Sequence, residues 1–338
     1  MSGSNTNEQE QQQSVWEYGA YVSRLPLIAS SLYPDASPIR RIKKSAVFCI
    51  NGIRQKRKLQ QIQKVFDCPE LAEVLKLFPA ILDKPFDPYV CVDWAVGERT
   101  TQIQSHFQYL KATFGENTAQ IYKPEGYRLF DFVTKEDERF FVQLFPGYQC
   151  EGSIGIRLCD SEAREVYTLS FHLSTDAAPV CYIGALQGPN DKVPDRQKTI
   201  VSLTRSLHGL RPKALMVETL CMVMRALEID LIYGVSNAGH IYQSDQYTDE
   251  KRAKVEFDFD QLWNEFNAEK HTASFYKLLS EPERKDASEI KPKKRSLYRK
   301  RYQWLDETAN CVQEAIKQLR LKPYQSGVPE LKKNGIAI

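Results

Sequence analysis

The sequence predicts an α+β fold, in which a mixed, mostly antiparallel sheet with crossover helices follows a helical N-terminal region. Two patterns along the 338 residues predict it. From Val15 to about Phe114, apolar residues recur at three- and four-residue spacing, which is typical of amphipathic helices. From about Gln120, apolar and polar residues alternate, which is typical of half-buried strands.

The chain divides into four predicted regions. Residues 1–14 are polar and rich in Gln, so we expect a disordered leader there. Residues 15–115 form the helical N-terminal region, and residues 116–290 form an α/β domain. Residues 291–338 form a basic helix and a tail, and we expect the tail to be loosely held.

Four segments of the α/β domain alternate in hydropathy, and we expect them to form an antiparallel meander. Turn-forming stretches such as KEDE and DSEA separate them. The segments are 120–134, 139–147, 150–160 and 164–173. The run VCYIGALQ, residues 180–187, predicts a fifth strand that continues the sheet.

A crossover unit follows this fifth strand. Residues 197–208 and 212–228 predict two helices, and residues 231–237 predict a strand that closes a strand–helix–strand unit. The second helix is apolar over most of its circumference, so we expect it to be buried against the sheet. The elements predicted after this unit are one more strand and a short helix around Trp263 within residues 247–266, and a short strand at 274–279.

Composition limits the classes of function. The net charge of +3 is too small to indicate nucleic-acid binding by the whole molecule, so a basic partner surface must come from local clustering. Eight cysteines lie scattered without a CxxC pair, which predicts reduced, buried thiols and no metal site.

No apolar run approaches the ~20 residues of a membrane helix, and no signal peptide is evident. We therefore expect a cytoplasmic protein with no transmembrane segment, and peripheral membrane contact stays open.

The stretch HGLRPK, residues 208–213, predicts an anion site. Gly209 can end one helix with a positive φ, and Pro212 suits the first turn of the next. Arg211 and Lys213 project where that helix exposes unpaired N–H groups and the positive end of its dipole. A phosphate, pyrophosphate or carboxylate would bind there. The alternative is a solvated helix start whose cations pair with a nearby acid.

Other residues beside this turn are candidates for holding the same ligand. Gln187 and Gly188 end the fifth strand, where they would orient a ligand or let it approach the backbone. His208 precedes Gly209, and capping the carbonyls of the preceding helix is an equally good role for it.

His240 is the candidate general base or acid. It follows the strand-end sequence VSNAG, and ligands bind at the carboxyl edge of open α/β sheets. Its imidazole can titrate near neutral pH, with Tyr242 and Ser236 as hydroxyl partners. The alternative is a buried or capping histidine. Walker, GxSxG, HExxH and GxGxxG motifs are absent, which argues against nucleotide hydrolases, serine hydrolases and zinc proteases.

A basic cluster marks the C-terminal region. Seven of the eleven residues 291–301 are Lys or Arg, and Tyr298, Tyr302 and Trp304 are interleaved with or follow them. Such a mixture can bind RNA or anionic lipid, or it can be a solvated helix face with its aromatic residues packed inward. The residues that we expect to contact nucleic acid or anionic lipid are Lys293, Lys294, Arg295, Arg299 and Arg301.

The chain resembles the bacterial VirK/YbjX family. The matching stretches include PAILDKPFDPYVC, CEGSIGIRL, CYIGALQGP, SLTRSLHGLRPKALMVETL, LIYGVSNAGHIY and KPKKRSLYRKRYQWLD, and they run in order through about residues 78–306. The resemblance implies an association with the bacterial envelope and virulence, and with it a peripheral location at the inner membrane, but no settled reaction. The family also looks distantly similar to GNAT acetyltransferase folds, although HGLRPK stands where those folds have a glycine-rich pyrophosphate loop.

Two functions follow as expectations. The first is a transferase that moves an acyl or aminoacyl group from a phosphate-bearing donor, such as acyl-CoA or aminoacyl-tRNA, to an amine or hydroxyl of a peptide, lipid or small molecule. Arg211 and Lys213 would bind the donor, and His240 would deprotonate the acceptor. The second is a non-enzymatic envelope factor that binds anionic lipid or RNA through the basic cluster.

Overall fold

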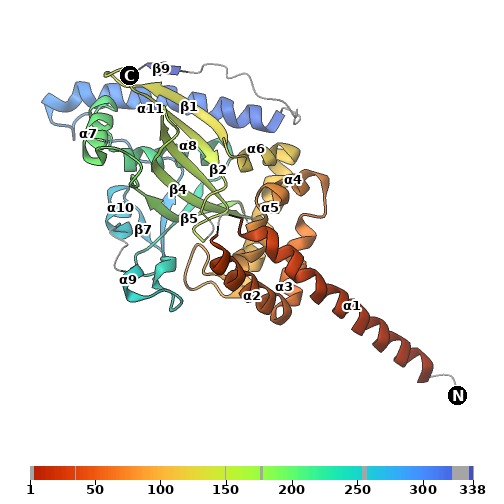
Figure 1. Ribbon diagram of the computed structural model, residues 1–338. Helices are drawn as coiled ribbons and strands as arrows, with labels where there is room; N and C mark the ends of the chain where they lie inside the picture. The colour runs from red at the N-terminus through yellow and green to blue at the C-terminus, as the bar shows by residue number, and fades with distance from the viewer. Residues whose placement is uncertain are drawn as a thin grey trace.

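The computed structural model describes residues 4–34, 36–148, 150–175, 178–252, 257–321 and 335–337. One sheet organises the α/β part, with strand order β7-β8-β6-β5-β4-β3-β2-β1-β9 (Figure 1). The strands are β1 (Tyr127–Val133), β2 (Arg139–Phe145), β3 (Ile154–Asp160), β4 (Glu165–Ser174), β5 (Val180–Gln187), β6 (Leu231–Val235), β7 (Glu269–Lys270), β8 (Phe275–Leu279) and β9 (Gly335–Ala337). The predicted mixed, mostly antiparallel sheet is confirmed, since among the described strands only the β5–β6 and β1–β9 pairs are parallel.

The predicted meander is confirmed, but its first strand is shorter than predicted, because residues 120–122 lie in α6 (Thr118–Tyr122) and β1 begins at Tyr127. β1 to β5 pair antiparallel with their neighbours in sequence order. Alternation in these strands is incomplete, because in β2, β3 and β4 residues on both faces are buried. Strands that are buried on both faces must be covered by other elements on both sides, and helices such as α5 (Val96–Phe114) and α8 (Pro212–Ala226) pack on this sheet.

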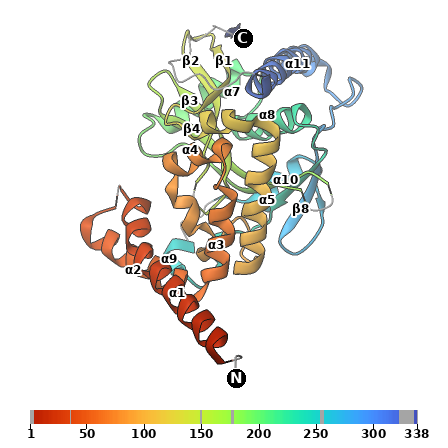
Figure 2. The same cartoon turned by 90° about the vertical axis from the view of Figure 1, so that its right-hand side faces the viewer.

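The predicted crossover unit is also confirmed. Between β5 and the parallel strand β6 lie α7 (Arg196–Ser206) and α8 (Pro212–Ala226). α8 is buried along most of its length, because it packs between β3 and β4 on one side and α11 (Pro292–Leu321) on another. Figure 2 shows α8 and α11 side by side.

The N-terminal region is helical, as predicted, and Figure 1 shows it to one side of the sheet. Its elements are α1 (Ser4–Leu32), α2 (Pro38–Arg54), α3 (Lys56–Val65), α4 (Pro69–Leu77), the 3₁₀ segment η1 (Pro79–Phe86), α5 (Val96–Phe114), the 3₁₀ turn η2 (Gly115–Asn117) and α6 (Thr118–Tyr122). The structure differs from the sequence at the expected disordered leader, because residues 4–14 lie within α1. Glu and Gln are good helix formers, so this polar segment extends the helix.

The C-terminal half of the domain adds short elements around β6 and β8. They are the 3₁₀ turn η3 (Ile241–Gln243), α9 (Asp249–Arg252) and α10 (Phe259–Glu265). The predicted helix around Trp263 is α10, and the indole of Trp263 packs over Gly234 and donates to the carbonyl of Val235 at 2.7 Å. The strand predicted before α10 falls partly on residues 253–256, which lie outside the described residues, as does most of the tail.

All eight cysteines are free thiols. Four of them are buried, as predicted, whereas Cys49, Cys68, Cys150 and Cys311 are only partly buried. In the part of the chain that the structure describes, no helix is both long and apolar enough to cross a membrane.

Candidate functional site

The start of α8 has the local geometry that the sequence predicts. Gly209 takes a φ of 77° and His208 a φ of 52° where α7 has ended, and Pro212 is the first residue of α8. The cations, however, are paired within the chain. Arg211 Nη2 lies 3.1 Å and Lys213 Nζ 2.9 Å from the two carboxylate oxygens of Glu265.

Binding of a donor phosphate by Arg211 and Lys213 stays a prediction. The anion at this helix start is the carboxylate of Glu265, as in the alternative that the sequence left open, so a donor phosphate would have to displace it. Glu265 ends α10, and Phe259 at the other end of α10 stacks on the ring of His240 at 4.9 Å. The predicted base and the predicted anion site therefore lie at opposite ends of α10, which at seven residues is about 10 Å long.

His240 is buried and is suited to donate a hydrogen bond. Its Nδ1 accepts the backbone N–H of Tyr242 at 3.4 Å, so in the neutral ring the proton sits on Nε2. Burial lowers the pKa of His240 to about 4, which keeps the ring neutral at pH 7. His240 thus caps η3 and is buried, as in the alternative that the sequence left open, and its Nε2–H can donate a hydrogen bond. The general acid or base role of His240 stays a prediction.

A small pocket of about 290 Å³ lies against His240. Tyr242, Arg252 and Asp258 bring polar groups to its wall, and Phe259 brings an aromatic ring. Ser236 is not among the lining residues. Its hydroxyl donates to the carbonyl of Ala273 at 2.7 Å and accepts the N–H of Gly239 at 3.0 Å, so Ser236 holds the turn after β6 rather than a substrate.

A buried ionisable cluster lies at the carboxyl end of β5. Gln187 Nε2 donates to Glu151 Oε1 at 2.6 Å, and Glu151 is 4% exposed. Burial raises the pKa of Glu151 to about 7, although Gln187, the nearby Lys84 ammonium and the Ser170 hydroxyl oppose the shift. Since Gln187 itself is exposed, the Glu151 carboxyl lies one hydrogen bond below the surface.

Lys84 completes the acid–base pair. It is 1% exposed, and its Nζ donates to the carbonyl of Gly152 at 2.6 Å. Burial lowers the pKa of Lys84 to about 7, while the nearby acidic groups Cys150 and Glu151 oppose the shift. Lys84 and Glu151 therefore each have a pKa near neutral and lie within electrostatic reach of each other, which is typical of functional sites.

Tyr242 and Tyr247 extend this cluster toward the His240 pocket. Their rings are 4.9 Å apart. Burial raises the pKa of Tyr242, and the charge of Glu151 raises it further, so the phenol lies within electrostatic reach of that carboxyl. Two predicted site residues, Gln187 and Tyr242, therefore lie near Glu151, and Gln187 is hydrogen-bonded to it.

The sheet explains why the cluster forms here. β5 pairs with β6 only as far as Ile183, and β5 then continues to Gln187 alongside β4. The carbonyl of Glu151 approaches Gly184 so closely that a side-chain carbon on that residue would lie 2.0 Å from it. A glycine is required there, because it lets the loop before β3 lie directly on β5.

The α8 start borders the same strand end. The predicted residue Gly188 lies against the ring of Tyr167, with 3.7 Å between the ring and a side-chain carbon built on the glycine. Burial raises the pKa of Tyr167, and the charge of Arg211 opposes the shift, so Arg211 lies near that ring as well. The predicted residue Gly188 therefore contacts Tyr167, and Arg211 lies within electrostatic reach of the same phenol.

Sequence reasoning missed Lys84 and Glu151. Both lie in stretches that carry the family resemblance, DKPFDPYVC and CEGSIGIRL, but a lone Lys or Glu in a loop is most often solvated. A signal was available in the apolar neighbours, because each charge sits inside a segment that is otherwise buried.

The predicted basic cluster lies at the start of α11, and two of its members are engaged. Arg301 donates twice to the carbonyl of His208, at 3.1 and 2.9 Å, and Arg295 Nε donates to the carbonyl of Ile290 at 3.1 Å. Lys293, Lys294 and Arg299 are exposed, and among the described residues they form no ion pair. Arg301 thus ties the start of α11 to the turn between α7 and α8 through the backbone carbonyl of His208.

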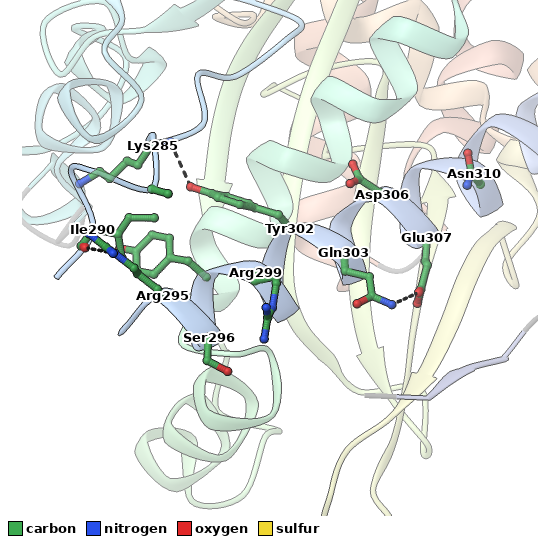
Figure 3. A pocket seen from close by; sticks show the side chains of 12 residues that line it. Lys285, Ile290, Arg295, Ser296, Arg299, Tyr302, Gln303, Asp306, Glu307 and Asn310 are labelled. Carbon is green, nitrogen blue, oxygen red and sulfur yellow. Dashed lines mark hydrogen bonds between the residues drawn. The ribbon is translucent and has the colours of Figure 1, made fainter. Parts of the chain in front are cut away.

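An open groove of about 880 Å³ runs along the outer face of α11 (Figure 3). Arg295, Arg299 and Tyr302 line one part of it, and Lys285 in the preceding loop faces them, with its N–H on the Tyr302 hydroxyl at 3.1 Å. Binding of RNA or anionic lipid by this cluster stays a prediction.

Comparison with known proteins gives relatives without an assigned activity. The family described as "Protein of unknown function (DUF535)" matches residues 38–314. Uncharacterized protein YbjX of Escherichia coli (strain K12) is 28% identical over 242 residues, which cover 70% of this chain and 72% of the relative. Two uncharacterized proteins of Haemophilus influenzae are 27% identical over 222 residues (65% and 72% coverage) and 34% identical over 155 residues (45% and 48% coverage). No solved structure gives a significant match.

Proposed function

The chain belongs to the VirK/YbjX (DUF535) family, and on this premise we propose that it is a transferase that moves an acyl or aminoacyl group to an amine or hydroxyl. The observation that carries the proposal is the buried carboxyl of Glu151, which Gln187 holds at the end of β5 and whose pKa burial raises to about 7. A base with a pKa near the working pH is most effective in proton transfer.

The sheet order supports the same class of reaction. An antiparallel meander followed by a parallel β5–β6 pair with crossover helices is the order that a GNAT-like fold requires. Within the described chain, residues 184–187 of β5 have no strand partner on the side of β6. Their backbone groups are placed to align an extended donor.

In the proposed reaction, the acceptor N–H or O–H gives its proton to Glu151 while its nitrogen or oxygen attacks the donor carbonyl. A C–N or C–O bond forms, and the C–S or C–O bond to the donor's carrier breaks. The leaving group takes a proton from the Lys84 ammonium, and transfer of the Glu151 proton to Lys84 restores the pair. The Nε2–H of His240, in the adjoining pocket, is a donor available to a substrate oxygen.

The test is a transfer assay with labelled donors. Purified protein is incubated with acyl-CoA or aminoacyl-tRNA and with fractions of bacterial peptides, lipids and small amines, and labelled products are identified by mass spectrometry. We expect transfer by the wild-type protein and none by the Glu151→Gln variant, which keeps the acceptor for Gln187. Absence of transfer, together with absence of donor binding in calorimetry, would overturn the proposal.

A further inference from the structure

Helix α2 carries large apolar side chains on two opposite faces. One face is buried, where Phe48 and Gly52 pack against α1, and the side chain of Leu25 lies directly over Gly52. The other face is exposed to solvent. Its large apolar residues, with their exposed fractions, are Ile39 (84%), Ile42 (72%), Val47 (49%), Ile50 (48%) and Ile53 (40%).

The spacing of these residues makes the exposed face continuous. Ile39, Ile42, Ile50 and Ile53, with the exposed Ala46 between them, are spaced by three or four residues, so they fall on one side of the helix, and Val47 lies at its edge. At 100° per residue, this side is opposite to Phe48 and Gly52. Single exposed aliphatic residues are ordinary, but a contiguous apolar stripe on a protein surface marks an interaction site.

Basic residues surround the stripe. Residues 36–66 contain nine Lys and Arg and no Asp or Glu, and the nine are Arg40, Arg41, Lys43, Lys44, Arg54, Lys56, Arg57, Lys58 and Lys64. None of them forms an ion pair with another described residue. The surface around the stripe is therefore strongly positive although the chain as a whole carries only +3.

We infer that α2 lies on an anionic lipid surface, with Ile39, Ile42 and Ile50 at the level of the acyl chains and Arg40 and Lys43 at the phosphates. An amphipathic helix with an apolar stripe and flanking cations is the usual form of such a contact. The helix lies in the plane of the membrane and does not cross it. The inference does not depend on the proposed transferase activity.

Charge selects a lipid over the other occupants of an apolar helix face. A second copy of the chain would bring its own nine cations against these nine, and like charges oppose such a contact. A nucleic acid would match the cations but would leave the isoleucines in water. Only an anionic membrane covers both the apolar stripe and its basic borders.

A comparison of α2 with the basic start of α11 also favours α2 as the element that contacts the membrane. The start of α11 is also basic, but its one large apolar residue exposed among the described positions is Leu297, which lies against Gly209. Figures 1 and 2 show α2 at the lower end of the molecule and α11 at the upper end. One flat membrane would therefore contact α2 while the groove on α11 stays in solution.

Vesicle flotation tests the inference with matched variants. The vesicles contain phosphatidylcholine alone or phosphatidylcholine and phosphatidylglycerol in equal parts. The charge variant Arg40→Gln/Lys43→Gln removes two exposed cations whose side chains form no hydrogen bond or ion pair with other described residues. The variant Lys293→Gln/Lys294→Gln on α11 removes the same charge. The apolar variant Ile42→Gln/Ile50→Gln is matched by Val201→Gln/Leu279→Gln, which are exposed on other elements. Circular dichroism checks that each variant is folded.

We expect the wild-type chain to float with the anionic vesicles and not with the neutral ones. The α2 charge variant should bind about 20-fold more weakly, since each cation near an anionic surface contributes roughly fivefold, and the α2 apolar variant about tenfold more weakly. The two control pairs should bind like the wild type. The inference is overturned if the α11 pair weakens binding as much as the α2 pair, if no variant changes it, or if light scattering shows a dimer that Ile42→Gln/Ile50→Gln dissociates and no vesicle binding.

Discussion

The start of α8 and the cluster around Glu151 both gather charges at the carboxyl end of β5, but they satisfy those charges differently. At α8, Arg211 and Lys213 are neutralised by one carboxylate, Glu265, at a partly exposed position. In the cluster, burial forces the pKa values of Glu151 and Lys84 toward each other until both are about 7. The first arrangement stabilises a helix start, while the second stores an exchangeable proton.

This difference shows what a local motif reveals. The stretch HGLRPK predicts its own turn and shows its two cations. It does not show that Glu265 neutralises them, because Glu265 lies in α10, more than 50 residues further along the chain. Reactivity at the Glu151 cluster comes from desolvation, and desolvation is a property of the whole fold. A charged residue on a helix start is thus a weaker indicator of chemistry than an acid–base pair that the fold has buried.

The largest expected effect is on the rate of transfer. Matched variants at Glu151 and Glu265 show which of the two regions, the Glu151 cluster or the α8 start, the reaction depends on. Glu151→Gln removes the proposed base and should lower the transfer rate by about 10²–10⁴-fold, the usual contribution of a general base. Glu265→Gln is the matched change at α8 and should leave the rate within about threefold of the wild type, because it removes no proton acceptor from the cluster. Initial rates with a saturating donor measure both. The reverse order of effects would show that the α8 start is the reactive region.

Much of the fold could be predicted from the sequence, because periodicity is a local property. The meander β1–β4, the β5–α7–α8–β6 unit and the helices of the N-terminal region each have a visible pattern, and so do Gly209 and Pro212 at their turn. Boundaries are less accurate: α7 ends at Ser206, where the sequence predicts 208, and β1 begins at Tyr127, where the sequence predicts 120, because residues 118–122 form α6.

The site could be predicted only in part. Gln187 and Tyr242 follow strand ends, where position alone indicates function, whereas Glu151 becomes chemically distinct only when Gly184 lets its loop lie on β5. For His240 the sequence left two roles open, and it could not decide between them, because the tautomer depends on the N–H of Tyr242 and the pKa on burial by the surrounding fold.

The second expected effect concerns pH and the histidines behind the cluster. His106 and His172 are fully buried and stack at 4.9 Å, and His106 Nδ1 accepts the N–H of Leu173 at 3.0 Å. Burial, with help from the Lys84 charge, lowers the pKa of His106 from 6.5 to about 3. Between these values the unfolded chain binds more protons than the folded chain, so the contribution of His106 to stability falls as the pH falls from 6.5 toward 3.

His106→Asn isolates this contribution, because its side-chain oxygen can still accept the N–H of Leu173. Glu151 has the opposite sign, since its raised pKa adds stability that is lost as pH rises through about 7, but it is present in both proteins and cancels. The difference in free energy of unfolding between wild type and variant should change by up to about 1.4 kcal/mol per pH unit between pH 6 and pH 4. Urea unfolding at several pH values measures it. A constant difference over this range would contradict a neutral, buried His106.

The smallest expected effect tests whether Glu265 closes the anion site at α8. Glu265→Gln leaves Arg211 and Lys213 without their carboxylate beside an uncapped helix start, so inorganic phosphate should bind there. At a phosphate concentration ten times the Kd, the variant should gain about 1.4 kcal/mol of stability, and the wild type should gain none at the same concentration. Thermal unfolding with and without phosphate measures both, at constant ionic strength. Adding Arg211→Ala to the variant should reduce the gain, because it removes one of the two cations. If phosphate stabilises the wild type as much as the variant, Glu265 does not close the site, and the helix start remains available to a donor phosphate as the sequence predicts.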